Sequence, residues 1–313
     1  MKLQLKLHAG RPDRPVVLLI HGLNMNNYFW LDPEKCQVLG GLAPLTVFLA
    51  DVVAKPENTL SFGSPAPHIR GLWTRLQEEG FSLASWTQGK PLGQIQAAMN
   101  ELAAVLATVR QRWPGVKIFL VGHSRGGLIA RRFLQQEVHG GIAGLVTICS
   151  PHAGSGMATF TRYLKPAGTF LKKIIPVKSK AALAQALERL SFFLQSPAIA
   201  ELEPGSEFMA SLQQAPLPRP IRKLSFGGTS PALFHVTVRL PTGSHRTIRF
   251  PDLLAAAVPS NRLPKELTPG LGDALVSAES AQLPGGAHYN FPVNHVKAAY
   301  DSEVHRVILD FLS

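Results

Sequence analysis

The sequence predicts an α/β protein with a mostly parallel central sheet, helices on both faces of that sheet, and an inserted helical cap (lid). Apolar runs of strand length alternate along the chain with segments whose apolar residues recur every three or four positions, which is typical of this class. A basic, apolar stretch interrupts the alternation between the expected strands at residues 142–150 and 221–228. We therefore expect residues 1–154 and 221–313 to form the core and residues 155–220 to form the cap.

Each expected element has a local signal. The longest helix is expected at residues 91–113, where Ile95, Met99 and Leu102 begin a row of apolar side chains at helical spacing. Residues 24–66 form a long connection, for which a hairpin at residues 45–62 is the one element suggested. The other expected helices are residues 67–80, 127–137 and a C-terminal helix beginning near His295, and the expected strands are residues 1–10, 15–22, 81–86, 116–122, 142–150, 221–228 and 286–293.

The composition is that of a folded protein, with 45% hydrophobic and 17% charged residues in a chain of 313. No apolar run is long enough to span a bilayer, and residues 1–10 alternate polar and apolar residues, unlike a signal peptide. We expect no transmembrane segment, and a cytoplasmic location if the chain is full length or a secreted one if it is a mature form lacking its leader. Cys149 ends an apolar run and is expected in the core.

The net charge of +12 is unevenly placed, since residues 155–200 contain seven Lys and Arg against one Glu. No zinc-finger spacing, aromatic RNA-binding strand or pair of basic helices accompanies this charge. We therefore expect no nucleic-acid partner. A basic, apolar cap instead fits transient contact with an anionic lipid–water interface.

The segment Gly122-His123-Ser124-Arg125-Gly126 joins an expected buried strand to an expected helix. Glycines at this spacing permit a sharp strand-to-helix turn that projects the serine hydroxyl from the carboxyl edge of the sheet. The free N–H groups at the start of the helix favour developing negative charge. Ser124 is therefore the candidate nucleophile, and its alternative role is that of a plain turn serine.

A nucleophilic serine needs a base and an acid that orients the base. His295 lies in the loop after the last expected strand, where a base can reach the same edge of the sheet, and is favoured over His288 and His305. Asp273 lies 22 residues before His295 and is favoured as the acid. Its alternative role is a helix cap or a turn, and the competing acids are Glu279 and Asp252.

Stabilisation of the tetrahedral oxyanion requires two further donors. The backbone N–H of Arg125, directly after the serine, is one candidate. The loop after the first core strand normally supplies the other, and here that group is the backbone N–H of Leu23 in the sequence His-Gly-Leu. The alternative for His21-Gly22 is a simple strand-ending turn.

These residues together resemble the bacterial lipases and esterases of the α/β-hydrolase superfamily, the serine lipases with a GHSxGG motif. The matching segments are VVLLIHGLN (16–24), VGHSRGGLIAR (121–131), VTICSPHAGSGMA (146–158), ELEPGSEFMASL (201–212), GDALVSAESAQL (272–283) and VNHV (293–296). The resemblance implies the α/β-hydrolase fold, with Ser124 as nucleophile, Asp273 as acid and His295 as base. It also implies that the Leu23 and Arg125 amides form the oxyanion hole.

Three departures from this resemblance concern metals and substrate. Lys297 stands two residues after His295, where calcium-binding lipases usually place an aspartate, so no calcium is expected. Zinc-binding relatives hold their metal in the long connection, where the candidates here, without recognisable ligand spacing, are Asp32, Cys36, Asp51 and His68. We expect no metal and no cofactor. Plant chlorophyllases share GHSRGG, but the other motifs do not support that narrower assignment.

The expected function is a serine carboxylic-ester hydrolase, a lipase or esterase, that cleaves acyl esters of lipids through an acyl-enzyme. The same triad would also serve a polyester depolymerase, thioesterase, phospholipase or acyltransferase, and a catalytically dead lipid-binding relative is the non-enzyme alternative. One expected helix in the cap has an apolar face formed by Leu183, Leu187, Leu190 and Leu194, with Phe193 beside it. This helix is either a lid that covers the serine or a helix that packs on the body of the protein.

Overall fold

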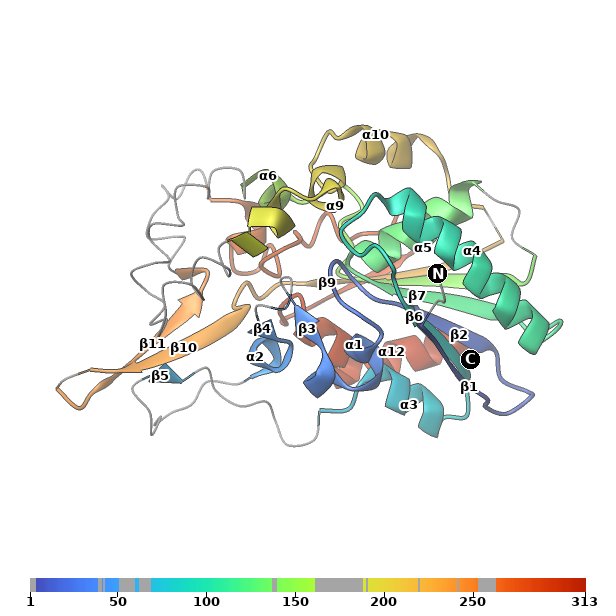
Figure 1. Ribbon diagram of the computed structural model, residues 1–313, viewed down its shortest axis with the longest axis horizontal. Coiled ribbons are helices and arrows are strands. Elements are labelled where there is room, and N and C mark those ends of the chain that lie inside the picture. The colour runs from blue at the N-terminus through green and yellow to red at the C-terminus, as the bar shows by residue number, and fades with distance from the viewer. Residues whose placement is uncertain are drawn as a thin grey trace.

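A seven-stranded sheet forms the centre of the molecule (Figure 1). The computed structural model describes residues 4–38, 41, 43–50, 60–61, 69–136, 140–160, 188–189, 191–218, 220–240, 242–252 and 263–313. In spatial order the strands are β1 (Gln4–His8), β6 (Ser82–Thr87), β2 (Val16–Ile20), β7 (Ile118–His123), β8 (Ile142–Ile148), β9 (Arg222–Gly228) and β12 (Ala287–Phe291). Only β1 runs antiparallel to its neighbour within this sheet. The expected mostly parallel sheet is confirmed.

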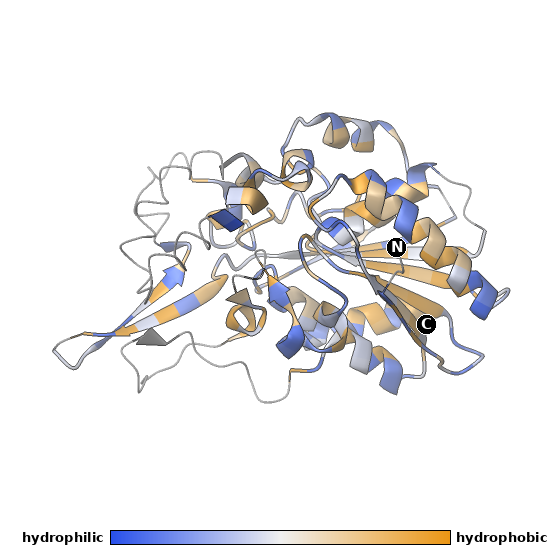
Figure 2. Ribbon diagram, viewed as in Figure 1, coloured by the Kyte–Doolittle hydropathy of each residue, from blue (hydrophilic) through white to orange (hydrophobic). Residues whose placement is uncertain are grey.

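Both faces of the sheet are covered, because its central strands are apolar on both sides. In β2, Val17 and Leu19 pack into one core cluster, and Val16, Leu18 and Ile20 pack into the other. The first cluster is covered by α1 (Tyr28–Leu31), α3 (Leu72–Glu78) and α12 (Ser302–Leu312), and the second by α4 (Ile95–Arg112) and α5 (Arg125–Gln136). Figure 2 shows the apolar strands between helices that are polar on their outer surfaces. Continuous apolar runs in the sequence thus mark strands buried on two faces.

Two expectations about elements are wrong. At the described ends of the hairpin suggested at residues 45–62, α2 (Thr46–Leu49) is helical and β5 (Leu60–Ser61) pairs with the distant strand β10 (Phe234–Arg239). Residues 51–59 and 62 of that segment lie outside the described residues. The C-terminal helix begins at Ser302, since the Asp301 side chain accepts the N–H groups of Glu303 and Val304 and caps the helix there. Residues Lys297–Tyr300 form a separate 3₁₀ helix, η5.

A second, three-stranded sheet was not expected. It consists of β11 (His245–Phe250), β10 and β5, and the β10–β11 hairpin extends away from the central sheet (Figure 1). Apolar and polar residues alternate throughout β10 and over the last four residues of β11, on either side of a Pro-Thr-Gly-Ser segment, so the sequence carried a hairpin signal here. The remaining short elements are η1 (Pro33–Lys35), β3 (Gln37–Val38), β4 (Ala43–Pro44) and η4 (Lys265–Leu267).

The predicted cap contains α6 (Gly156–Phe160), α9 (Pro197–Glu201) and α10 (Glu207–Gln214), which lie on the same side of the molecule in Figure 1. Of the predicted lid face, Leu183, Leu187 and Leu190 fall outside the described residues. The division into core and cap therefore stays a prediction. Among the described helices, none has both the length and the hydrophobicity that a membrane span requires.

Candidate active site

Ser124 occupies the turn between β7 and α5 in a left-handed backbone conformation, with φ of 54°. The turn is tight enough to require its glycines. A Cβ atom on Gly122 would lie 2.4 Å from the backbone nitrogen of Gly127, and one on Gly126 would lie 2.3 Å from the carbonyl oxygen of Ile20. Ser124 is 8% exposed. The strained serine turn that the glycine spacing predicts is therefore present in the structure.

His295 and Asp273 lie together at the carboxyl edge of the sheet. Nδ1 of His295 is 3.0 Å from Oδ2 of Asp273. The other carboxylate oxygen, Oδ1, accepts the backbone N–H groups of Leu275 at 2.9 Å and Val276 at 2.7 Å. Because a carboxylate accepts hydrogen bonds, the neutral imidazole carries its proton on Nδ1 and keeps a lone pair on Nε2. Both side chains are buried, so the pair is held in one orientation.

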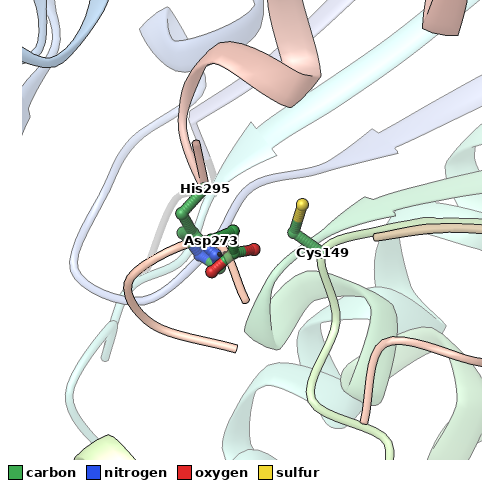
Figure 3. Close-up of side chains that lie close together, drawn as sticks. All are labelled: Cys149, Asp273 and His295. Atoms are coloured by element: carbon green, nitrogen blue, oxygen red, sulfur yellow. Dashed lines mark hydrogen bonds and ion pairs between the residues drawn. The ribbon is translucent and has the colours of Figure 1, made fainter. Parts of the chain in front are cut away.

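Cys149 lies beside this pair (Figure 3). The Sγ atom, a carboxylate oxygen of Asp273 and a ring nitrogen of His295 lie within 4.8 Å of one another. Burial first, and the negative charge of Asp273 second, raise the pKa of Cys149 well above its ordinary value. A metal ion would need the thiolate and would have to displace the hydrogen bonds of Asp273, so these three groups are poorly suited to metal binding. Cys149 is buried, as expected for a core residue.

The serine turn and the His295 loop are joined through His123, the residue before Ser124. Nε2 of His123 lies 2.9 Å from the carbonyl oxygen of His295, and the two rings are 4.9 Å apart. Within the described part of the chain, no hydrogen bond connects Ser124 Oγ with the His295 ring. Catalytic hydrogen bonds are often loose in ligand-free sites and tighten when substrate binds.

The loop after β2 passes directly over the serine. A Cβ atom on Gly22 would lie 3.1 Å from Cβ of Ser124, so the backbone of Gly22 and Leu23 is adjacent to the nucleophile candidate. The Arg125 N–H belongs to the first residue of α5. The two predicted oxyanion donors therefore lie on segments that flank Ser124. Burial lowers the pKa of His21 to about 4, so this strand-ending histidine is neutral near pH 7.

The two competing histidines are engaged in other contacts. His288 lies in β12, where its ring contacts the Ser225 hydroxyl at 2.9 Å and Oδ1 of Asn290 at 3.0 Å. His305 is buried in α12 and contacts the carbonyl of Ala299 at 2.8 Å. Neither ring contacts Asp273 in the described part of the chain.

The competing acids are on the surface. Glu279 pairs with Lys265 at 2.6 Å, and Asp252 pairs with Arg249 at 3.2 Å. All four side chains are more than half exposed, whereas Asp273 is fully buried. The geometry thus favours Asp273 over both alternatives.

A cavity of about 850 Å³ lies between the loop before α4 and the segment leading into α9. Its wall is mostly apolar, and the sequence did not predict it. It is lined by Lys90, Pro91, Leu92, Gly93, Glu188, Ser191, Phe192, Gln195, Ser196 and Pro197.

Comparisons with known proteins support the fold. Residues 80–197 match the model of the family described as "Serine aminopeptidase, S33". The mature form of Bacillus licheniformis lipase BlEst2 is 18% identical, covers 99% of this chain and 98% of its own, and gives a TM-score of 0.61. Its propeptide form gives 0.60 at 16% identity, covering 98% and 53% of the two chains. The metagenomic carboxyl esterase MGS0156 gives 0.52 at 15% identity, covering 97% and 77%. No match is found among curated proteins.

The sheet order, the serine turn after β7 and these likenesses show that the protein has the α/β-hydrolase fold of these lipases and esterases. The resemblance in the sequence is thereby confirmed at the level of fold. The catalytic roles of individual residues stay predictions.

Proposed function

We propose that the protein is a serine carboxylic-ester hydrolase, a lipase or esterase that acts through an acyl-enzyme. The observation that carries this proposal is the buried hydrogen bond between His295 and Asp273. The loop that contains His295 is also hydrogen-bonded to the serine turn, through His123. A surface histidine would not need its tautomer fixed by a buried carboxylate. This arrangement suits a base that must present an unprotonated Nε2 to a neighbouring hydroxyl.

In the proposed reaction, His295 Nε2 removes the proton from Ser124 Oγ as that oxygen attacks the carbonyl carbon of an ester. The negative charge that develops on the carbonyl oxygen is stabilised by the Leu23 and Arg125 N–H groups. Protonated His295, held through Nδ1 by Asp273, then donates its proton to the departing alcohol. Water enters, loses a proton to His295 and attacks the acyl-enzyme, which releases the carboxylic acid and restores Ser124.

The proposed substrates are acyl esters of lipids. We propose that the apolar cavity beside α9 receives the acyl chain, since burying each methylene group is favourable by about 0.8 kcal/mol. We also propose that residues 155–220 form a cap and that the Lys and Arg residues of this segment make transient contact with a lipid–water interface. The matching family's description names an aminopeptidase, so peptide-bond hydrolysis is the competing activity to be tested.

The test is a series of p-nitrophenyl esters from acetate to palmitate, with emulsified triglyceride and an aminoacyl p-nitroanilide assayed in parallel. We expect ester hydrolysis that Ser124→Ala abolishes, together with a preference for chains longer than acetyl. Preferential cleavage of the anilide would support the peptidase instead. Absence of turnover on every substrate would support the catalytically dead lipid-binding alternative. A short-chain optimum would contradict the lipid substrate while leaving ester hydrolysis in place.

Further assays separate the remaining alternatives. Thioester, phospholipid and polyester substrates test for a thioesterase, a phospholipase and a polyester depolymerase, and an added alcohol acceptor detects acyl transfer.

A further inference from the structure

The side chain of Arg125 is completely buried one residue after Ser124. Its guanidinium is shielded from solvent and reaches the loop before α4. Nη2 donates to the carbonyl of Gly93, and Nη1 lies 3.4 Å from the carbonyl of Pro91 and 3.5 Å from Oε1 of Gln88. Burying a guanidinium costs several kcal/mol unless its donors are satisfied, and these acceptors offset part of that cost at Nη1 and Nη2. Nε of Arg125 has no acceptor among the described residues.

Gln88 extends this contact to the loop that carries the other oxyanion donor. Its backbone N–H donates to Nε2 of His21 at 3.1 Å, and its side-chain Nε2 donates to the His21 carbonyl at 3.1 Å. His21 is followed by Gly22 and Leu23. One side chain therefore separates the Arg125 guanidinium from the segment that presents the Leu23 N–H.

Glu201 of α9 neutralises the buried charge. Its Oε2 lies 3.6 Å from Nη2 of Arg125, and the same carboxylate accepts the N–H of Ile95 at the start of α4, at 2.9 and 3.1 Å. Desolvation lowers the pKa of Arg125, and the nearby Glu201 opposes that shift. The guanidinium thus connects α5, the loop before α4 and the last helical turn of α9.

We infer that Arg125 is a positioning residue whose guanidinium sets the spacing between the two oxyanion donors, its own backbone N–H and that of Leu23. The inference rests on the proposed function. Both donors are backbone groups, so their alignment depends on what holds their segments. Oxyanion donors must lie about 2.7–3.1 Å from the developing charge. A misplacement of about 1 Å can cost about a hundredfold in rate.

The expected signature is a loss of turnover without a loss of substrate binding. Arg125→Lys keeps a positive charge near Glu201, but an ammonium cannot span the acceptors on Gln88, Pro91 and Gly93 together. We expect kcat to fall by about tenfold to a hundredfold with KM within about twofold of the wild type. Affinity for a boronic-acid inhibitor, which mimics the oxyanion, should fall in parallel with kcat.

Arg131 provides a matched control. It lies on the same helix, is 3% exposed and donates to the carbonyls of His152 and Leu212, not to the loop before α4. Arg131→Lys should lower Tm but leave kcat within about twofold, because only thermal stability depends on its contacts. All variants are assayed well below their measured Tm.

Gln88→Met is the second variant, for the case in which Arg125→Lys does not fold. At similar volume it removes the side-chain hydrogen bond to the His21 carbonyl and the acceptor that faces Arg125 Nη1. The backbone N–H bond from residue 88 to His21 Nε2 and the ion pair of Arg125 with Glu201 remain. We expect the same loss of kcat at unchanged KM. Equal losses of kcat in the Arg125 and Arg131 variants would overturn the inference, and so would an Arg125 variant in which only KM changes. In either case the proposed function would still stand if the wild type hydrolyses esters and Ser124→Ala does not. A wild type without Ser124-dependent hydrolysis would overturn both.

Discussion

Nε2 of His123 donates a hydrogen bond to the carbonyl oxygen of His295 across 2.9 Å. Burial lowers the pKa of His123 well below its ordinary value, so the ring is neutral and the proton lies on the nitrogen that faces the carbonyl. The ring also stacks on Phe29, with centroids 4.5 Å apart. The residue before the candidate nucleophile thus holds the backbone of the candidate base.

Replacing His123 tests this connection. His123→Phe keeps a flat ring against Phe29 but leaves the His295 carbonyl without its partner. We expect the free energy of unfolding to fall by about 1–3 kcal/mol and kcat to fall, because a buried acceptor is left unsatisfied and the His295 loop is released. Urea unfolding and ester hydrolysis measure the two effects. If stability and turnover were both unchanged, the hydrogen bond from His123 to the His295 carbonyl would not position the His295 loop.

Asp273→Asn tests the choice of acid. The amide cannot fix the Nδ1–H tautomer of His295 as a carboxylate does, so we expect kcat to fall by about 10⁴. The control is Glu279→Gln, at the exposed carboxylate that pairs with Lys265, where activity should be unchanged. The reverse pattern of losses would assign the acid to Glu279.

The parts of the site that could be predicted from sequence are those that depend on local pattern and chain order. Glycine spacing predicts the turn at Ser124, and the order of loops along the sheet predicts that Asp273 and His295 meet. The contacts of Arg125 with Glu201 and of Cys149 with Asp273 join distant segments, and no local pattern encodes them. The hairpin of β10 and β11 did carry an alternating signal, whereas α2 is a single helical turn set by its tertiary contacts.

Gly126→Ala tests the close approach of α5 to β2. The added Cβ would meet the Ile20 carbonyl oxygen at 2.3 Å, so backbone must move. We expect the free energy of unfolding to fall by about 1–3 kcal/mol or more. In Gly140→Ala no described residue lies within 4 Å of the added atom, and the change should stay within about 0.5 kcal/mol. Similar values for the two variants in urea unfolding would contradict the tight turn.

The buried histidines predict acid lability. The pKa of His21 falls from 6.5 to about 4 in the folded protein because of burial, so below about pH 6.5 the unfolded chain binds a proton that the folded protein does not. The free energy of unfolding should therefore decrease as pH falls from 6.5 to 4, by about 3 kcal/mol from this group. His123 and His152 act in the same direction. A urea midpoint that is constant between pH 7 and pH 5 would contradict this, and His21→Asn should flatten the slope.

Covalent labelling with a fluorophosphonate, followed by peptide mass spectrometry, tests the central claim most directly. The reagent reacts with a serine only when that serine is activated by a base and an oxyanion hole. We predict a single adduct on the peptide that contains Ser124, strongly slowed labelling of His295→Gln, and no adduct on Ser124→Ala. Labelling of another serine, or no labelling of the folded wild-type protein, would contradict the assignment of Ser124 as the nucleophile.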